Sequence, residues 1–129
     1  MDWKQYENEI YDYFRSVYPE ATLTPDARIT GKFSKIERQI DLLIEVEMAD
    51  FRFRVVVDGK YRDKKIDVND VEAFLSFVRD VEASKGLMIS TEGYSSAAMN
   101  RAALVAADFV VIPIGPDLFS LQGRRITFR

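Results

Sequence analysis

The sequence contains neither cysteine nor histidine. Without cysteine there is no disulfide framework, no thiolate nucleophile and no zinc–thiolate site. Without histidine there is no imidazole base and no imidazole metal ligand. Chemistry near neutral pH must therefore rely on carboxylates, lysine, hydroxyls or a bound hard cation. Because carboxylates select magnesium or manganese over softer metals, we expect a metal site in this chain to take Mg²⁺ or Mn²⁺.

Long apolar runs, linkers and repeats are also missing. No segment approaches the ~18 consecutive apolar residues of a membrane helix, and the N-terminus has no basic patch followed by an apolar run. We therefore expect a soluble, unexported protein of the cytoplasm with no membrane partner. The 129 residues are 47% apolar and can bury one substantial core, which predicts a single domain over residues 1–129.

Positive charge is in slight deficit. The chain has 18 Lys and Arg against 21 Asp and Glu, which gives a net charge of −3. Nucleic-acid binding usually uses a basic face, and the composition as a whole does not indicate one. The basic residues can still gather locally while the acidic residues lie elsewhere.

The periodicity of apolar residues predicts the secondary structure. Helical spacing and N-capping residues predict helices over residues 2–17, 67–80 and about 95–106. Alternation and β-branched residues predict strands near 28–33, 38–47, 51–61, 87–90 and 109–112, with 22–26 as a loop and 118–128 as a terminal hairpin. This order, α-β-β-β-α-β-α-β, predicts an α/β fold with a mixed central sheet flanked by helices. The aromatic residues expected to pack in the core, rather than to stack on bases, are Trp3, Phe14, Phe74, Phe77 and Phe109.

A two-residue turn at Ala49-Asp50 would fix the register of the two long strands. One face of the hairpin is then wholly apolar, and the other carries two complementary ion pairs that support antiparallel strands. The predicted cross-strand pairs are Ile40–Gly59, Leu42–Val57, Ile44–Val55 and Val46–Phe53 on the apolar face, and Glu45–Arg54 and Glu47–Arg52 on the polar face.

The same register, continued along the polar face, places Asp41 opposite Asp58 and Gln39 opposite Lys60. Directly opposed residues have Cβ atoms roughly 4.5–5.5 Å apart, so two like charges destabilise the pair. Two opposed acids beside a lysine therefore indicate a bound divalent cation. The structural alternative is that Lys60 and nearby arginines neutralise both carboxylates at an exposed end of the sheet.

The pattern of Asp41 on one strand and Asp58-Gly59-Lys60 on the next resembles the motif of the PD-(D/E)XK nuclease superfamily. Tyr6-Glu7 on the first helix resembles the helical Phe-Glu or Tyr-Glu of Mrr-like restriction endonuclease domains. Residues 38–41 resemble the strand that bears their first acid, and residues 85–98 resemble their strand-to-helix segment. The resemblance spans roughly residues 3–105. It departs from the family at Asp58, where Glu is more common, and at Gly59, where a small apolar residue is usual.

The resemblance implies a restriction-endonuclease-like fold and metal-dependent internal cleavage of DNA. By that likeness Asp41, Asp58 and the Gly59 carbonyl hold Mg²⁺ or Mn²⁺, Lys60 positions the attacking water and Glu7 orients an outer water. Helical geometry places Glu7 at the edge of the apolar face of the first helix, which suits this role. An ordinary surface glutamate at a boundary position is the alternative.

Further basic residues lie beyond the motif. Lys64 and Lys65 are candidates for phosphate contacts, as are Arg124, Arg125 and Arg129 in the tail, although short basic clusters are more often only solvated.

Two other functions are compatible with the sequence. The first is a catalytically inactive nuclease-fold module that binds nucleic acid or a partner protein, which the acidic net charge favours. The second is a domain of a homodimer or larger assembly in which a partner supplies the basic DNA-binding surface.

Overall fold

The structure, a computed structural model, describes residues 2–105 and 110–114. In chain order the elements are α1 (Trp3–Val17), β1 (Thr22–Thr30), β2 (Glu37–Met48), β3 (Phe51–Lys60), α2 (Val68–Asp80), β4 (Lys85–Ser90), α3 (Ser96–Val105) and β5 (Val110–Ile114). The predicted order α-β-β-β-α-β-α-β is confirmed. The predicted terminal hairpin, Phe109 and the tail arginines lie outside the described residues.

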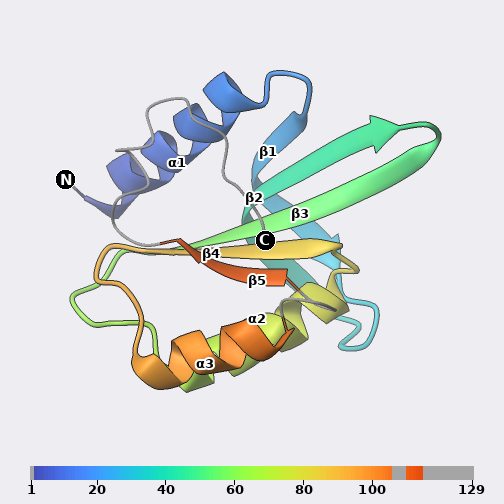
Figure 1. The fold of residues 1–129 in the computed structure, drawn as a ribbon. Helices are drawn as coiled ribbons and strands as arrows, with labels where there is room; N and C mark the ends of the chain where they lie inside the picture. Colours follow the sequence, from blue (N-terminus) through green and yellow to red (C-terminus); the bar gives the residue numbers. More distant parts are fainter. Residues whose placement is uncertain (1, 106–109, 115–129) are drawn as a thin grey trace.

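The strands form one mixed sheet in the order β1-β2-β3-β4-β5. The β1–β2 and β2–β3 pairs are antiparallel, and the β3–β4 and β4–β5 pairs are parallel. Figure 1 shows α1 on one side of this sheet and α2 with α3 on the other. One core cluster joins α1 to Leu42 and Val57 of the sheet. The other joins α2 and α3 to Leu43 and Val56, so the expected helices on both faces are confirmed.

Local capping explains where the first two helices begin. Asp2 and Gln5 form a reciprocal capping box at the start of α1, and Asp67 and Asp70 form another at the start of α2. Below α1, a Cβ added at Gly59 would lie 3.0 Å from Ile10 Cδ1, so glycine there lets the helix approach the sheet closely. Across the described ranges, no helix has the length and apolarity to cross a membrane.

The prediction that Trp3 packs in the core is wrong, because 57% of its surface is exposed. Trp3 lies one helical turn before Tyr6, which is buried. It is therefore nearer the N-terminus than Tyr6 and Ile10, the residues of α1 that approach Gly59. Helical spacing alone predicts the side of the helix on which a residue lies, but not where the sheet beneath the helix ends.

The predicted register of the β2–β3 hairpin is confirmed from Met48–Phe51 to Leu42–Val57. The two expected ion pairs also form: Arg52 lies 2.9 Å from Glu47, and Arg54 lies 3.7 Å from Glu45. The ladder between these described strands ends at Leu42–Val57, so the three pairs predicted beyond it are wrong as ladder partners. These are Ile40–Gly59, Asp41–Asp58 and Gln39–Lys60.

The apolar face also changes side at this point. Ile40 was predicted to share a face with Leu42, but it packs in the cluster of α2 and α3 whereas Leu42 packs against α1. The residue between them, Asp41, has no partner in the β1–β2 ladder, and its counterpart Asp26 has a positive φ of 50°. This left-handed backbone interrupts the pairing, so strict alternation fails there.

Two strand boundaries differ from the prediction because of proline. Residues 22–26 belong to β1, with Pro25 opposite Leu42, and β5 continues through Pro113, opposite Met88. Both strands lie at the edges of the described sheet. Proline is tolerated on edge strands, since its missing N–H can face away from the ladder. Residues 31–33, predicted as strand, lie in the connection between β1 and β2.

Candidate active site

Asp41 and Asp58 lie where β2 and β3 cease to pair. In place of a ladder bond, the Gly59 N–H donates a 3.0 Å hydrogen bond to Asp41 Oδ2. The side chain of Asp41 thus reaches across to β3, beside Asp58. The structure therefore brings the two predicted acids together through a side chain rather than through opposed strand positions.

The pKa of Asp41 is raised above its usual value. Burial of the carboxyl is the main cause, and the negative charge of Asp58 adds to it. The Gly59 hydrogen bond and the charge of Lys60 act in the opposite direction. Because the carboxylate form is disfavoured here, a cation bound nearby would be favourable.

Asp58 and Lys60 stand at the end of β3. Lys60 Nζ lies 3.2 Å from Asp58 Oδ2, an ion-pair distance. Even so, Asp58 Oδ2 is buried and accepts no hydrogen bond from any group in the described ranges. Lys60 therefore neutralises this oxygen by charge without a well-aligned hydrogen bond, which leaves the oxygen able to bind a further donor or a cation.

The residues present fit a hard divalent cation. Carboxylate and carbonyl oxygens are the ligands that magnesium and manganese prefer, and the unsatisfied oxygen of Asp58 is one such donor. Within residues 2–105 and 110–114, no three acidic side chains gather closely enough to form a metal site by themselves. The predicted set needs only Asp41, Asp58 and the backbone carbonyl of Gly59.

The two acids line different pockets. Asp41 lines a pocket of about 430 Å³ under α1, whereas Asp58 and Lys60 line one of about 210 Å³ beside α2. Gln39 lines both pockets, so they adjoin. The prediction of a single polar face is therefore wrong in detail, since Asp41 lines the pocket under α1 and Asp58 lines the pocket beside α2.

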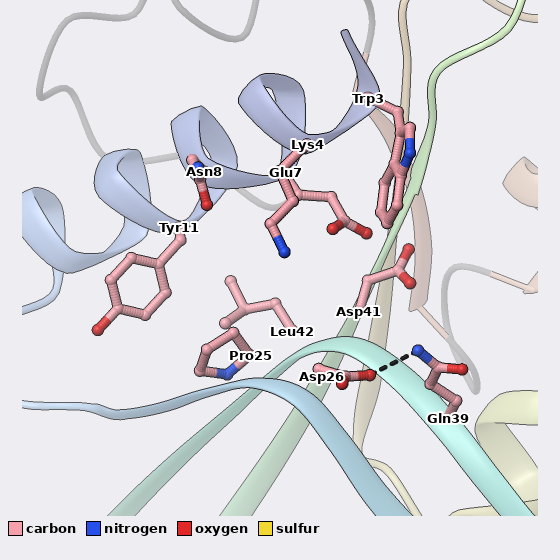
Figure 2. A pocket seen from close by; sticks show the side chains of 10 residues that line it. All are labelled: Trp3, Lys4, Glu7, Asn8, Tyr11, Pro25, Asp26, Gln39, Asp41 and Leu42. Atoms are coloured by element: carbon pink, nitrogen blue, oxygen red, sulfur yellow. Dashed lines mark hydrogen bonds between the residues drawn. The ribbon is translucent and has the colours of Figure 1, made fainter.

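Glu7 projects from α1 into the larger pocket. Figure 2 shows its carboxylate pointing toward that of Asp41, with Trp3 alongside. The pKa of Glu7 is raised, first by burial and then by the negative charge of Asp41. The structure thus places Glu7 in the same pocket as Asp41.

Asp26 is a site residue that the sequence analysis missed. It lines the same pocket as Asp41 and accepts a hydrogen bond from Gln39 Nε2 (Figure 2). Because residues 22–26 were predicted to form a loop, the sequence analysis did not place Asp26 near Asp41. Extending β1 back through Pro25 would have placed Asp26 opposite Asp41 by counting along the register.

Lys64 and Lys65 are exposed in the connection between β3 and α2. They are not among the residues that line the pockets around Asp41, Asp58 and Lys60. Arg62, nearer the site, forms an ion pair with Asp70 at the start of α2.

Comparison with known proteins places this geometry in context. Residues 1–121 match the model of the Mrr_cat family, described as a restriction endonuclease. No curated protein matches the chain significantly.

Several solved structures share the fold. The protein of unknown function AF1548 has a TM-score of 0.62 and 12% identity, over 83% of this chain and 55% of that one. VC1899 from Vibrio cholerae has a TM-score of 0.56 and 12% identity, over 90% of this chain and 30% of that one. The DNA modification-dependent restriction endonuclease AspBHI has a TM-score of 0.57 and 14% identity, over 92% and 31%. This chain therefore spans about half of AF1548 and about a third of the other two.

Proposed function

Because the chain belongs to the Mrr_cat restriction endonuclease family, we propose that it is a metal-dependent endonuclease that hydrolyses phosphodiester bonds in DNA. The observation that carries this proposal is the environment of the carboxylates of Asp41 and Asp58. The Gly59 N–H holds Asp41, whose pKa is raised by burial and by the charge of Asp58. A buried oxygen of Asp58 is ion-paired with Lys60 but accepts no hydrogen bond from the described part of the chain.

Asp41, Asp58 and the Gly59 carbonyl would hold Mg²⁺ or Mn²⁺. When bound, such an ion supplies Lewis-acid chemistry, because it polarises a phosphoryl oxygen and lowers the pKa of water. The carboxylates contribute negative charge to the site, and the Gly59 N–H fixes the orientation of Asp41. Truncating either acid would therefore remove one of the anionic oxygen donors of the proposed ligand set.

Lys60 and Glu7 would act on the attacking water and on the scissile phosphate. The ammonium of Lys60, 3.2 Å from Asp58, would position the attacking water and stabilise the negative charge that develops on the phosphoryl oxygens. Glu7, with its carboxylate toward Asp41 (Figure 2), would accept a hydrogen bond from an outer water and orient it. Exposed Lys64 and Lys65 would contact phosphates farther along the strand.

Plasmid cleavage tests this function. Purified protein is incubated with supercoiled plasmid and magnesium or manganese, with and without EDTA. We expect nicking or linearisation that EDTA abolishes and that Lys60→Ala lowers by about 10²–10³-fold, the usual effect of losing one charge-stabilising donor.

The matched control is Lys85→Ala, because Lys85 is exposed and begins β4 at the other end of its pairing with β3. This variant should cleave like the wild type. Undiminished cleavage by a clean Lys60→Ala preparation would remove Lys60 from the mechanism.

A second function is favoured by the net charge of −3, which suits a catalytically inactive module that binds nucleic acid or a partner protein. A homodimer or larger assembly would supply the basic surface that the composition lacks. DNA binding without cleavage in either metal would support the module over the enzyme.

A further inference from the structure

A smaller pocket adjoins Lys60 on the side of α1. It has a volume of about 260 Å³, below the roughly 300–1,000 Å³ of sites for drug-sized ligands, so its size suits a single ring system. It shares Trp3 and Glu7 with the larger pocket of Asp41. The residues that line it are Trp3, Tyr6, Glu7, Gly59, Lys60, Tyr61 and Arg62.

Aromatic rings form much of its wall. Trp3 is 57% exposed and Tyr61 is 40% exposed, although large aromatic side chains usually bury most of their surface. Tyr61 is supported from below by the buried ring of Tyr6, with ring centroids 5.4 Å apart and planes inclined by 34°. The pocket therefore presents exposed aromatic surface on a rigid base.

Two cations accompany these rings. Lys60 lines the pocket from the end of β3, and Arg62 follows Tyr61 and is held by its ion pair with Asp70. Aromatic side chains next to basic groups recognise single-stranded nucleic acid, because bases stack on the rings while phosphates meet the cations. A paired base inside a duplex has no free face for such stacking.

We propose that this pocket binds an unpaired nucleobase of the DNA strand to be cut, stacked against Trp3 and Tyr61, with its phosphate toward Lys60. The inference rests on the proposed nuclease function and names its substrate class. That class is DNA with an unpaired nucleotide at or beside the cleaved bond, as in single strands and flaps. The exposure of Trp3 then follows from substrate binding, since a core role does not account for it.

Tryptophan fluorescence tests the pocket directly, because Trp3 is the only tryptophan in the chain. The protein is titrated in EDTA with a short oligothymidylate and, separately, with a blunt duplex of the same length. We expect the single strand to quench Trp3 emission at lower concentration than the duplex does. Equal responses to the two, or no response to the single strand, would overturn the proposal.

Variants of Tyr61 test whether its ring stacks on the bound base. Binding of a labelled oligothymidylate, followed by fluorescence anisotropy, should weaken by about 5- to 150-fold in Tyr61→Ala, the range expected for losing one stacked base. Tyr61→Phe should retain wild-type affinity because it keeps the ring. The matched control is Phe51→Ala, which removes a 67% exposed ring from the far end of β3 and should leave affinity unchanged. Equal affinity of Tyr61→Ala and wild type, with matching urea midpoints, would overturn the stacking role.

These binding experiments separate the pocket from the nuclease. Strand-selective quenching that depends on Tyr61 supports the pocket even if no metal yields cleavage. Cleavage that is equally fast on duplex and single strands, and unaffected by Tyr61→Ala, refutes the pocket while leaving the nuclease intact. Tighter binding of oligouridylate than of oligothymidylate would overturn the assignment to DNA.

Discussion

Asp80 differs from the half-buried pair Asp41 and Asp58 in how fully its oxygens are hydrogen-bonded within the fold. Asp80, at the end of α2, is 4% exposed and receives four hydrogen bonds from the connection between β1 and β2 and from the start of β2. The donors are Phe33 N at 2.8 Å, Ser34 N at 2.9 Å, Ser34 Oγ at 2.6 Å and Arg38 Nη1 at 2.7 Å. These bonds, that of the Ser34 hydroxyl foremost, hold the pKa of Asp80 far below its usual value.

Asp41 and Asp58 have the opposite character. Asp41 accepts one backbone hydrogen bond and has a raised pKa, and Asp58 keeps an oxygen without a hydrogen bond among the described residues. Asp80 is the most buried of the three aspartates, so burial by itself does not identify a functional acid. The carboxylate of Asp80 is used within the fold, whereas Asp41 has a raised pKa and Asp58 keeps an oxygen that lacks a hydrogen bond from the residues described. This difference is the basis on which we propose the pair, and not Asp80, as the metal site.

The largest expected effect is on cleavage. Asp58→Asn should lower metal-dependent plasmid cleavage by at least about 10²–10³-fold, because it removes an anionic donor from the site. Asp50→Asn is the matched control, since Asp50 is exposed in the hairpin turn with φ 66°, a conformation that asparagine also adopts. Comparable cleavage rates in the two variants would show that Asp58 matters no more for cleavage than an exposed aspartate in a turn.

Asp80→Ala should cause the largest loss of stability of any variant proposed for this chain. It leaves two backbone N–H groups and the Arg38 guanidinium without their buried acceptor. Urea unfolding measures the effect, with Asp12→Ala on the exposed side of α1 as control. A midpoint for Asp80→Ala equal to that of Asp12→Ala would show that the network contributes little.

Magnesium should stabilise the wild type. At a concentration about tenfold above its dissociation constant, the gain in the free energy of unfolding is roughly 1.4 kcal/mol. For a domain of this size the gain corresponds to about 3–6 °C in melting temperature. The same shift should appear in Asp80→Asn and be missing in Asp58→Asn. A shift that persists in Asp58→Asn would place the ion elsewhere.

Asp80 and Asp41 should also respond to pH with opposite sign. The lowered pKa of Asp80 adds stability that is complete above the ordinary aspartate pKa of about 3.9 and is lost below it. The raised pKa of Asp41 costs stability that grows as pH rises above that value. In EDTA, lowering the pH toward about 4 should therefore remove the advantage of Asp41→Asn, whereas the deficit of Asp80→Asn should shrink only as the pH falls further, below about 3.9. If the difference in unfolding free energy between the wild type and either variant did not change with pH, the direction of the pKa shift of that aspartate would be contradicted.

The sequence predicted the features that depend on local patterns. The register of the hairpin followed from its turn and its charge pairs, and Ala49 and Asp50 do adopt the positive φ values of 51° and 66° that a tight turn requires. The motif residues Asp41, Asp58 and Lys60 lie beyond the last paired residues of β2 and β3, although Asp41 lines a different pocket from the other two.

The features that were missed depend on contacts between distant segments. The place of Pro25 on an edge strand follows from the order of the sheet, which local composition does not reveal. The interruption at Asp26 turns Ile40 to the other face, and alternation cannot predict such a change. The exposure of Trp3 depends on where α1 crosses the sheet, which helical spacing leaves open.

Urea unfolding of the wild type and Asp41→Asn, each in EDTA and in magnesium, tests the central claim most directly. Asparagine can still accept the Gly59 hydrogen bond while removing the charge that burial and Asp58 disfavour. In EDTA the variant should be more stable than the wild type by on the order of 1 kcal/mol, as expected where function costs stability. Magnesium should stabilise only the wild type. A variant that is less stable than the wild type in EDTA, and that gains as much from magnesium, would contradict a carboxylate pair held in place for a cation.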